Sequence, residues 1–461
     1  MSTTAPVPYN VDSSATAWTQ KYTVDAQTMI TLQTKRAATT ASALTALKTA
    51  ISTYQTSLSA LTANKTLMAQ SGTVSNTAIA TATAKPTAAP GTYSFFVESL
   101  ASTNQIAIDL PASSNTPATG KLEIKINGTL AFDVDLKAAD TNNAGGLTPK
   151  EIAAAINAEP HNTSMVTASV ITIGGAEKLV LTSGTGGEAG AVTLSTSGMK
   201  VPDDDTLDNA LGATPKQLVE GKDAVIWLGA QTTGTQIKQG SNTFTGIAGV
   251  SMNLTKAQAP GDAAVTLTVG LDSAATNANV QSFVDSYNKL KAVLDDLTNP
   301  GDPQKGVPAG PFADDSGMRA LRDQMIRTLR ENSVGAMSTY GISATREGKL
   351  ALDTTRLTKM LAINPGGLDT AIGNTSPSAP SGVTSKLDKY LKVWTNGATG
   401  QLVQRQAANA KQQAALVRKQ ADFEKDYVNV FNRYKLQFGK LNQLQDQMAR
   451  NNDMFDALFN K

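Results

Sequence analysis

The chain has 461 residues, which is enough for roughly three domains that each bury a core. Its net charge is +2 and only 17% of its residues are charged, so it lacks the basic surface that nucleic-acid binding needs. It has no cysteine and one histidine, which excludes Cys-based nucleophiles and His-rich or Cys-rich zinc sites.

Neither membrane insertion nor a cleaved signal is predicted. No apolar run approaches the roughly 18 residues that cross a bilayer, and the first 30 residues lack the short apolar core of a signal peptide. A conventional interpretation is therefore a cytoplasmic protein. The absence of cysteine also fits a protein exported without a cleaved signal, because such a chain needs no disulfides in either compartment.

The sequence predicts a polar N-terminal segment that is followed by a weak helix. Residues 1–40 contain Pro6, Pro8 and many small polar residues, which predicts a segment that is poorly ordered or ordered only on assembly. The stretch "LTALKTAISTYQTSLSAL" follows, with apolar spacings of three and four that are typical of a heptad helix. These seam residues are Leu44, Leu47, Ile51, Tyr54, Leu58 and Leu61. Because the remaining residues are mostly Thr, Ser and Ala, we expect this helix to be marginal without a partner.

Residues 71–275 have the pattern of a β region. In "KLEIKINGTLAFDVDL", apolar residues alternate with polar ones on both sides of Asn127 and Gly128, which predicts a hairpin with one buried face. Period-two patterns predict further strands in "GTYSFFVESLA", "EKLVLTSG", "AVTLSTSG" and "DAAVTLTVGLD". Thr148, Pro149 and Glu151 predict a short capped helix between them.

Helices return after residue 279. Val280, Phe283, Val284, Tyr287, Leu290, Leu294 and Leu297 predict the apolar face of one helix. A second is predicted in "MRALRDQMIRTLRE", a third in "LDTTRLTKML" with Asp353 as its N-cap, and one long proline-free tract from about Leu387 to Phe459. That tract has a second seam, formed by Tyr427, Phe431, Tyr434, Phe438, Leu441 and Met448.

Two seams at opposite ends of one chain suggest that they meet as an antiparallel pair. The predicted fold class is thus α+β multidomain, with a helical terminal coiled-coil or bundle leg and β-rich head domains inserted between the N- and C-terminal helices. The expected parts are leg segments (1–42 and 418–461), a helical bundle (43–70 and 276–417), a β-rich head (71–106 and 215–275) and a second head inserted in it (107–214).

Catalytic and metal-binding patterns are sparse. His161, in "AEPHNTS", is more readily a solvated turn residue than a catalytic base. The acidic runs Asp203–Asp205 and Asp314–Asp315 lack the alternating ligand spacing of an EF-hand loop, so solvated or helix-capping roles are favoured. We therefore predict no enzyme, no metal and no cofactor.

Several segments together resemble the flagellar hook-associated protein 2 family, the filament cap. "GTYSFFVESLA" resembles its first head strand, "TGIAGVSMNL" and "VTLTVGLD" its return strands, and "VQSFVDSYNKL" a family helix. The most specific segment is "YGISATREGKLALD", where Gly341, Ile342, Gly348, Lys349, Leu350 and Asp353 match family turns and a helix start. "GPFADDSGMRALRDQM" is similar to the segment before it. The matches span about residues 44–370, whereas Tyr340 and the opening "PVPYNVDSSATAWTQ" depart from the family pattern.

The resemblance implies a ring, a pentamer on the filament, at the distal tip of the bacterial flagellum. It implies a head plate and helical legs that retain exported flagellin and promote its folding and insertion. It also implies export through the flagellar type III apparatus without a cleaved signal, and a chaperone on the C-terminal helix. The alternatives are a secreted adhesin whose head binds host glycans and another hook-filament junction protein.

Overall fold

The computed structural model describes residues 10–63, 66–111, 120–141, 146–198, 206–332 and 336–459. The chain divides into two compact units, Met1–Leu67 with Ala274–Lys461, and Met68–Ser273. The first unit uses both ends of the chain, so the second is inserted into it. The predicted fold class is confirmed, with helical terminal segments around a β-rich middle. The finer division into four parts stays a prediction.

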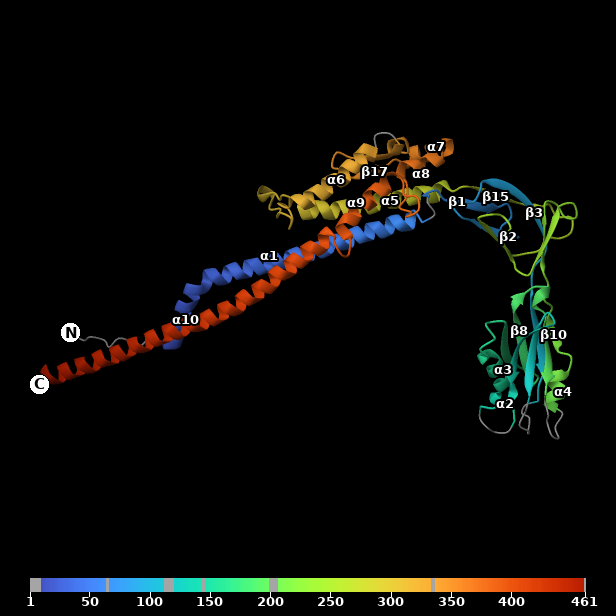
Figure 1. Cartoon of the computed structure of the whole chain (residues 1–461), viewed down its shortest axis with the longest axis horizontal. Coiled ribbons are helices and arrows are strands. Elements are labelled where there is room, and N and C mark those ends of the chain that lie inside the picture. Colours follow the sequence, from blue (N-terminus) through green and yellow to red (C-terminus); the bar gives the residue numbers. More distant parts are fainter. Residues whose placement is uncertain are drawn as a thin grey trace. The chain divides into compact units, whose positions relative to one another are not determined.

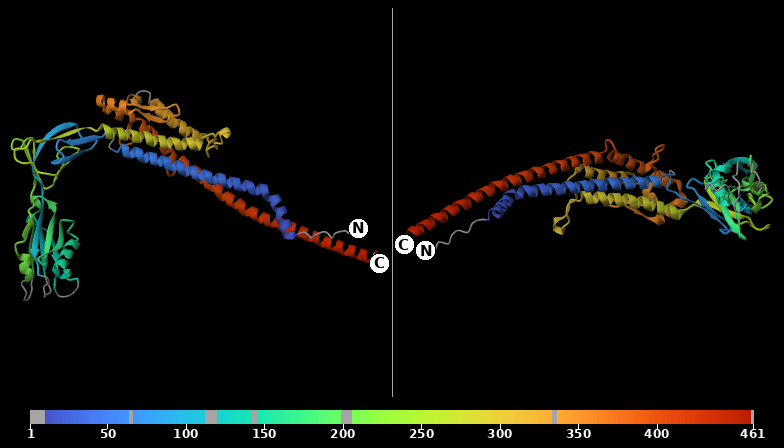
Figure 2. Two further views of the ribbon diagram at one scale, coloured as in Figure 1. Left: turned by 180° about the vertical axis from the view of Figure 1, so that it is seen from behind. Right: turned by 90° about the horizontal axis from the view of Figure 1, so that it is seen from below.

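The helical unit contains long terminal helices and a set of shorter ones between them. In Figures 1 and 2, α1 and α10 run side by side in every view. The helices are α1 (Val11–Leu61), α5 (Ser273–Thr298), α6 (Ser316–Asn332), α7 (Thr354–Ile363), α8 (Gly366–Ile372), α9 (Gly382–Thr395) and α10 (Gln401–Phe459). A 3-10 turn η2 (Pro303–Lys305) and the hairpin of β16 (Ile342–Ala344) and β17 (Leu350–Leu352) complete the described part.

Helix α5 provides much of the core of this unit. The seven residues predicted for its apolar face are all buried, which confirms that pattern. Burying such a side chain contributes about 1.5–3 kcal/mol relative to leaving it in water. Polar groups on α5 also fix the β16–β17 hairpin, because Tyr287 Oη donates to the Gly348 carbonyl at 3.1 Å and Asn288 bonds both backbone groups of Leu350 at 2.8 and 2.9 Å.

The segment "YGISATREGKLALD" forms this hairpin and starts α7. Gly341 and Gly348 have φ of 76° and 80°, a region that side chains with a Cβ rarely adopt. Asp353 accepts a hydrogen bond from the Arg356 N–H at 3.0 Å, so the predicted N-cap is confirmed.

The predicted helical tract from Leu387 to Phe459 is wrong as a single helix, because the chain breaks between α9 and α10. Asn396 ends α9, and its side-chain oxygen accepts from the N–H groups of Ala398 and Thr399 at 2.9 and 3.0 Å. At Gly400, a Cβ would lie 2.4 Å from the Asn396 carbonyl oxygen. The local Asn turn thus competes with the helix without any proline.

The inserted unit has two hydrophobic cores. One lies between a five-stranded sheet, ordered β1-β15-β3-β11-β12, and a three-stranded sheet, ordered β13-β14-β2. These strands are β1 (Gln70–Val74), β2 (Ala80–Ala84), β3 (Gly91–Ser99), β11 (Ala224–Leu228), β12 (Thr235–Gln239), β13 (Thr243–Phe244), β14 (Val250–Leu254) and β15 (Val265–Leu271).

The other core lies among a four-stranded sheet, ordered β10-β4-β8-β7, a three-stranded sheet, ordered β6-β5-β9, and short helices. The strands are β4 (Thr103–Asp109), β5 (Lys121–Ile126), β6 (Thr129–Asp135), β7 (Val166–Ile173), β8 (Ala176–Gly186), β9 (Val192–Ser197) and β10 (Lys216–Val219). The helices are α2 (Leu136–Ala139), α3 (Pro149–Ala158), η1 (Glu188–Gly190) and α4 (Thr206–Gly212).

The local predictions for this unit are confirmed. β5 and β6 pair through a turn in which Asn127 and Gly128 have φ of 51° and 75°, as a tight hairpin requires. Helix α3 has the predicted capping box between Thr148 and Glu151. The four other predicted strands correspond to β3, β8, β9 and β15.

Candidate assembly surface on the terminal helices

The helices α1 and α10 pair in one antiparallel register. Ala37 lies opposite Asn409, Gln27 opposite Gln420, and Asp12 opposite Lys435. The Asp12 carboxylate and the Lys435 ammonium are 2.7 Å apart. We call this segment, residues 12–37 with 409–435, the terminal helix pair. Helix α1 begins at Val11, so it includes most of residues 1–40, the segment that was predicted to be poorly ordered or ordered only on assembly. Residues 1–9 lie outside the described residues, and the dependence on assembly stays a prediction.

Threonine weakens α1 along its length. Thr hydroxyls donate back to carbonyls four residues earlier at 2.7–3.0 Å, a bond that slightly destabilises and often bends a helix. The donors are Thr16, Thr19, Thr23, Thr28, Thr31, Thr39 and Thr45. In the terminal helix pair, α1 buries the small residues Ala15, Thr19, Thr23 and Ala37, so little apolar surface holds the pair together.

Aromatic rings and cations gather where α1 begins. The Arg433 guanidinium lies 5.6 Å from the Tyr22 ring centroid and 5.3 Å from that of Tyr434, and Tyr434 is 6.2 Å from Trp18. Cation–π contacts at such exposed positions contribute about 0.5–1 kcal/mol each. Trp18 and Tyr22 are nevertheless 51% and 64% exposed.

The first predicted seam is buried, but not against the second seam. Leu44, Leu47, Ile51, Tyr54 and Leu58 are at most 1% exposed, and Leu61 is half-buried. Tyr54 packs edge-on against Tyr287 of α5, with ring centroids 6.4 Å apart, and the neighbouring Gln55 donates to Asp388 of α9 at 3.0 Å. The inference that the two seams meet is therefore wrong.

The two seams do not meet because of the register in which α1 pairs with α10. A pair that joins Ala37 to Asn409 places the second seam beside the beginning of α1, about 30 residues before the first seam. Tyr427, Phe431, Tyr434 and Phe438 are half-buried there, whereas Leu441 and Met448 are 37% and 57% exposed. Their role in assembly stays a prediction.

Sequence reasoning missed the polar contact that sets this register. Asn409 is 6% exposed, and its side-chain amide donates to the Ala37 carbonyl at 3.1 Å, with Gln413 reaching the same oxygen at 3.4 Å. Trp18 and Tyr22, four residues apart, were also missed. Their spacing is a helical signal, but it lies among small polar residues that predicted disorder.

Large apolar side chains stay exposed on both terminal helices. On α1 these are Trp18, Tyr22, Val24, Met29 and Leu32, which are 47–64% exposed. On α10 they are Val417, Val428, Leu436, Leu441, Leu444, Met448, Met454, Phe455 and Leu458, which are 37–70% exposed. Such concentrations of apolar surface mark sites of protein association.

A groove of about 750 Å³ runs between the two helices beside this surface. Its wall on α1 includes Ile30 and Ala38, and its wall on α10 includes Leu416, Val417 and Ala421. Lys35, Glu424 and four polar side chains also line the groove, so its apolar walls lie beside charged and polar groups.

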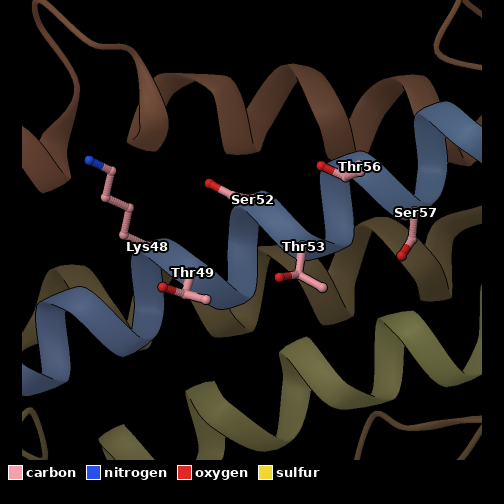
Figure 3. Close-up of a pocket in the computed structure, with 6 residues that line it drawn as sticks. All are labelled: Lys48, Thr49, Ser52, Thr53, Thr56 and Ser57. Carbon is pink, nitrogen blue, oxygen red and sulfur yellow. The ribbon is translucent and has the colours of Figure 1, made fainter.

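A second groove, of about 580 Å³, follows the outer face of α1. Figure 3 shows its lining of Lys48 and five hydroxyl side chains, Thr49, Ser52, Thr53, Thr56 and Ser57. Lys48 is the one ionisable side chain among these residues, and no carboxylate or imidazole accompanies it there.

Beneath this face, the Tyr54 hydroxyl has no hydrogen-bond partner among the described residues. Burial raises the pKa of Tyr54, and the nearby Tyr287 and Asp388 raise it further. A hydroxyl that ionises this reluctantly is a core group and a poor acid or base.

The sequence contains His161 and two acidic runs as candidates for catalysis or cation binding. Those that the structure describes make local structural contacts. His161 is exposed in its predicted turn and pairs with Glu159 at 2.8 Å. Asp315 accepts from the Met318 N–H at 2.9 Å and forms an ion pair with Arg405, so it caps α6 and ties it to α10. Burial acts to raise the pKa of Asp315, but the hydrogen bonds from Arg405 and Met318 outweigh it and lower that pKa. Asp203–Asp205 lie outside the described residues.

In the part of the chain that the structure describes, no group of three or more His, Asp or Glu side chains could hold a metal ion. Within the same residues, no helix combines the length and the apolar character needed to span a membrane.

Comparisons with known proteins match both chain ends. The flagellar hook-associated protein 2 N-terminus model matches residues 9–104, and the C-terminus model matches residues 221–450. The N-terminal match includes most of the opening segment that we had predicted to depart from the family.

Two curated relatives cover most of the chain. The lateral flagellar hook-associated protein 2 of Vibrio parahaemolyticus is 32% identical, over 81% of this chain and 83% of the relative. The B-type flagellar hook-associated protein 2 of Pseudomonas aeruginosa is 29% identical, over 89% of this chain and 88% of the relative.

Among solved structures, the D1-D2-D3 domains of the flagellar cap protein FliD from Escherichia coli are similar. They superpose with a TM-score of 0.60 at 25% identity, over 80% of this chain and 99% of that chain.

Proposed function

Because the chain belongs to the flagellar hook-associated protein 2 family and is a flagellar filament cap protein, we propose that several copies form a ring at the distal filament end. The family is a structural one, and the absence of catalysis in this chain stays a prediction. The ring, a pentamer as the family resemblance implies, retains exported flagellin and promotes its folding and insertion beneath the cap.

The observation that carries this proposal is the terminal helix pair. It brings both chain ends, which the two family models match, into one helical leg with exposed apolar side chains on each helix. A two-helix leg has too little buried surface to be stable alone, so it suits a segment that becomes ordered against other protein. In this proposal the leg engages the filament end, and the inserted β unit belongs to the plate.

The small buried surface of the terminal helix pair also fits the route by which the protein reaches the filament. We propose export through the flagellar type III apparatus without a cleaved signal, followed by a location outside the cell at the flagellar tip. A chain without cysteine and with a weakly built α1 can travel unfolded and pair afterwards. Before the chain passes through the export apparatus, an export chaperone covers the exposed apolar side chains of α10.

No feature of the described residues favours a glycan-binding head, and we do not propose one.

Electron microscopy of filaments incubated with the purified chain tests the cap role. Filaments polymerised from purified flagellin, which carry no cap, are mixed with gold-labelled chain, and a chain without residues 401–461 is the matched control. We expect label at one end of each filament and none with the control. Label along the filament sides, at both ends, or with equal frequency for the control would contradict the proposal.

A further inference from the structure

A cluster of cationic side chains lies where α1 and α10 run side by side. Residues 28–41 of α1 and 406–421 of α10 contain five cations and no aspartate or glutamate. The contact of Ala37 with Asn409 brings these two stretches together, and all five cations are exposed. We call them the basic band, and they are Lys35, Arg36, Lys411, Arg418 and Lys419.

The cations of the basic band form no ion pair with any residue that the structure describes. Other cations of α10 do, since Arg405 pairs with Asp315 and Lys435 pairs with Asp12. No aspartate or glutamate occurs in the remaining segments of the helical unit, which are residues 1–9, 64–65, 333–335 and 460–461. Within this unit, the charge of the basic band is therefore not offset by an ion pair.

A single sign of charge is unusual for a helix surface that faces only water. Exposed helix faces commonly alternate acidic and basic residues, which pair along the helix. The next part of α10 does so, because it contains Asp422, Glu424, Lys425 and Asp426, with Lys425 3.9 Å from Asp422. In the basic band, like charges repel one another across a helix pair that buries little apolar surface. An acidic partner relieves this repulsion.

The neighbours of the basic band favour a protein as this partner. Val417 is 70% exposed and directly precedes Arg418 and Lys419. Leu32 is 47% exposed and lies about one turn before Lys35. Such a mixture of apolar and cationic side chains is typical of protein interfaces, and each guanidinium can bind a carboxylate through two hydrogen bonds. These features fit a protein surface that carries aspartate or glutamate.

We propose that the basic band binds acidic side chains of the flagellin subunits at the filament end. The inference rests on the proposed function, in which the leg engages that end. On assembly, carboxylates of flagellin supply the ion pairs that the helical unit lacks, and this stabilises the leg where it meets the filament. Because exposed charges interact over about 8 Å at physiological salt, the contact is sensitive to ionic strength.

Neutral variants of the full chain test the proposal. Glutamine is the replacement, because its helix propensity is close to that of lysine and arginine. The basic-band variant combines Lys411→Gln, Arg418→Gln and Lys419→Gln. The matched control removes the same charge from three exposed lysines of the inserted unit, and it combines Lys216→Gln, Lys238→Gln and Lys256→Gln.

Each chain is gold-labelled and mixed with filaments polymerised from purified flagellin, and the chain concentration that labels half of the filament ends is measured. At about 50 mM NaCl, we expect this concentration to rise about tenfold for the basic-band variant and to stay within about twofold for the control. At about 300 mM NaCl, the natural chain should weaken by a similar factor and the basic-band variant much less, since it has fewer charges to screen. Circular dichroism checks that both variants keep the helix content of the natural chain.

Crosslinking with a carbodiimide identifies the partner. This reagent joins a lysine amine to a carboxylate in direct contact, with an amide bond formed and water lost to the reagent. We expect mass spectrometry to find amides between Lys411 or Lys419 and aspartate or glutamate of flagellin. Amides to the inserted unit or to a second copy of this chain, in place of flagellin, would overturn the proposal.

The labelling of filament ends separates this inference from the cap role. If the natural chain labels the ends, but neither salt nor the glutamine substitutions change the concentration required, the basic band is not the contact and the cap role stands. If the natural chain labels no ends at either salt concentration, the cap role fails and the contact with flagellin fails with it.

Discussion

Asn409 shows how one buried polar side chain can set the alignment of two long helices. Its amide donates to the Ala37 carbonyl, while its own oxygen has no hydrogen-bond partner among the described residues. A buried unsatisfied acceptor costs about 1–3 kcal/mol, so Asn409 contributes more to register than to stability.

Replacement of Asn409 tests whether this residue contributes more to the register of the two helices than to their stability. We expect Asn409→Leu to change the free energy of unfolding of the helical unit by less than about 1 kcal/mol, because the lost bond is offset by removal of the unsatisfied oxygen. Asn409→Asp, of equal size, should cost about 2–4 kcal/mol at pH 7, because it buries a charge facing a carbonyl. Urea denaturation of both variants measures this, and a larger loss for the leucine variant would contradict it.

Asp315 links the beginning of α6 to α10, and its contribution depends on pH. Its pKa in the folded chain is lower than its ordinary value of 3.8, so the carboxylate stabilises the folded state fully above that value. The contribution is lost as the pH falls through the lower folded pKa.

Asp315→Asn therefore has a predictable pH profile. We expect a loss of about 1–2 kcal/mol at pH 7, from a weakened cap and a lost ion pair. The difference from the natural chain should shrink below pH 3.8, as measured by urea denaturation at pH 7 and pH 3. His161→Asn, at an exposed turn, is the control. An equal loss at both pH values would show that the charge of Asp315 is not involved.

At the scale of elements, the first seam was correctly predicted as a buried face, but its partner was not. Heptad spacing locates the face that a helix buries, whereas the opposing helix depends on register. Here the register of α1 and α10 keeps the second seam away from the first, and the first seam packs against α5 and α9 instead. Sequence patterns have no simple signal for such a contact.

The beginning of α1 illustrates the other limit. It buries small residues such as Ala15 and Thr19, so the apolar periodicity that reveals a helix is almost absent. Tight turns were predictable, because Asn127-Gly128 and Thr148-Pro149 restrict the backbone locally. The Asn396 turn was not, since it depends on a side chain that also occurs within helices.

Ile51 and Leu58 test the revised position of the first seam. Both are fully buried in the helical unit, so replacing both with Asp should unfold that unit and not merely prevent assembly. The inserted unit has its own cores and should keep its structure. Hydrogen exchange should show lost protection in α5 and retained protection in β3 and β8. Thr49→Asp with Thr56→Asp, on the exposed face, is the matched control, and retained protection in α5 of the Ile51/Leu58 variant would contradict the assignment.

At the scale of the whole molecule, the chain divides into two units with different surfaces and cores. A helical unit made from both chain ends carries exposed apolar side chains, and an inserted β unit contains two hydrophobic cores of its own. This insertion was visible in the sequence as a change from heptad spacing to alternation and back, which is why the fold class could be predicted. This division suits the proposed export and cap roles, because a marginal leg can pair after passage while the insert has cores of its own.

The partition of flagellin in a cap-deletion strain tests the central claim most directly. The strain expresses the natural chain, and flagellin is quantified in filaments and in the culture medium. We predict that flagellin moves from the medium into filaments of increasing length when the chain is present and exported. If the exported chain left most flagellin free in the medium, as in the strain without it, this protein would not act as the filament cap.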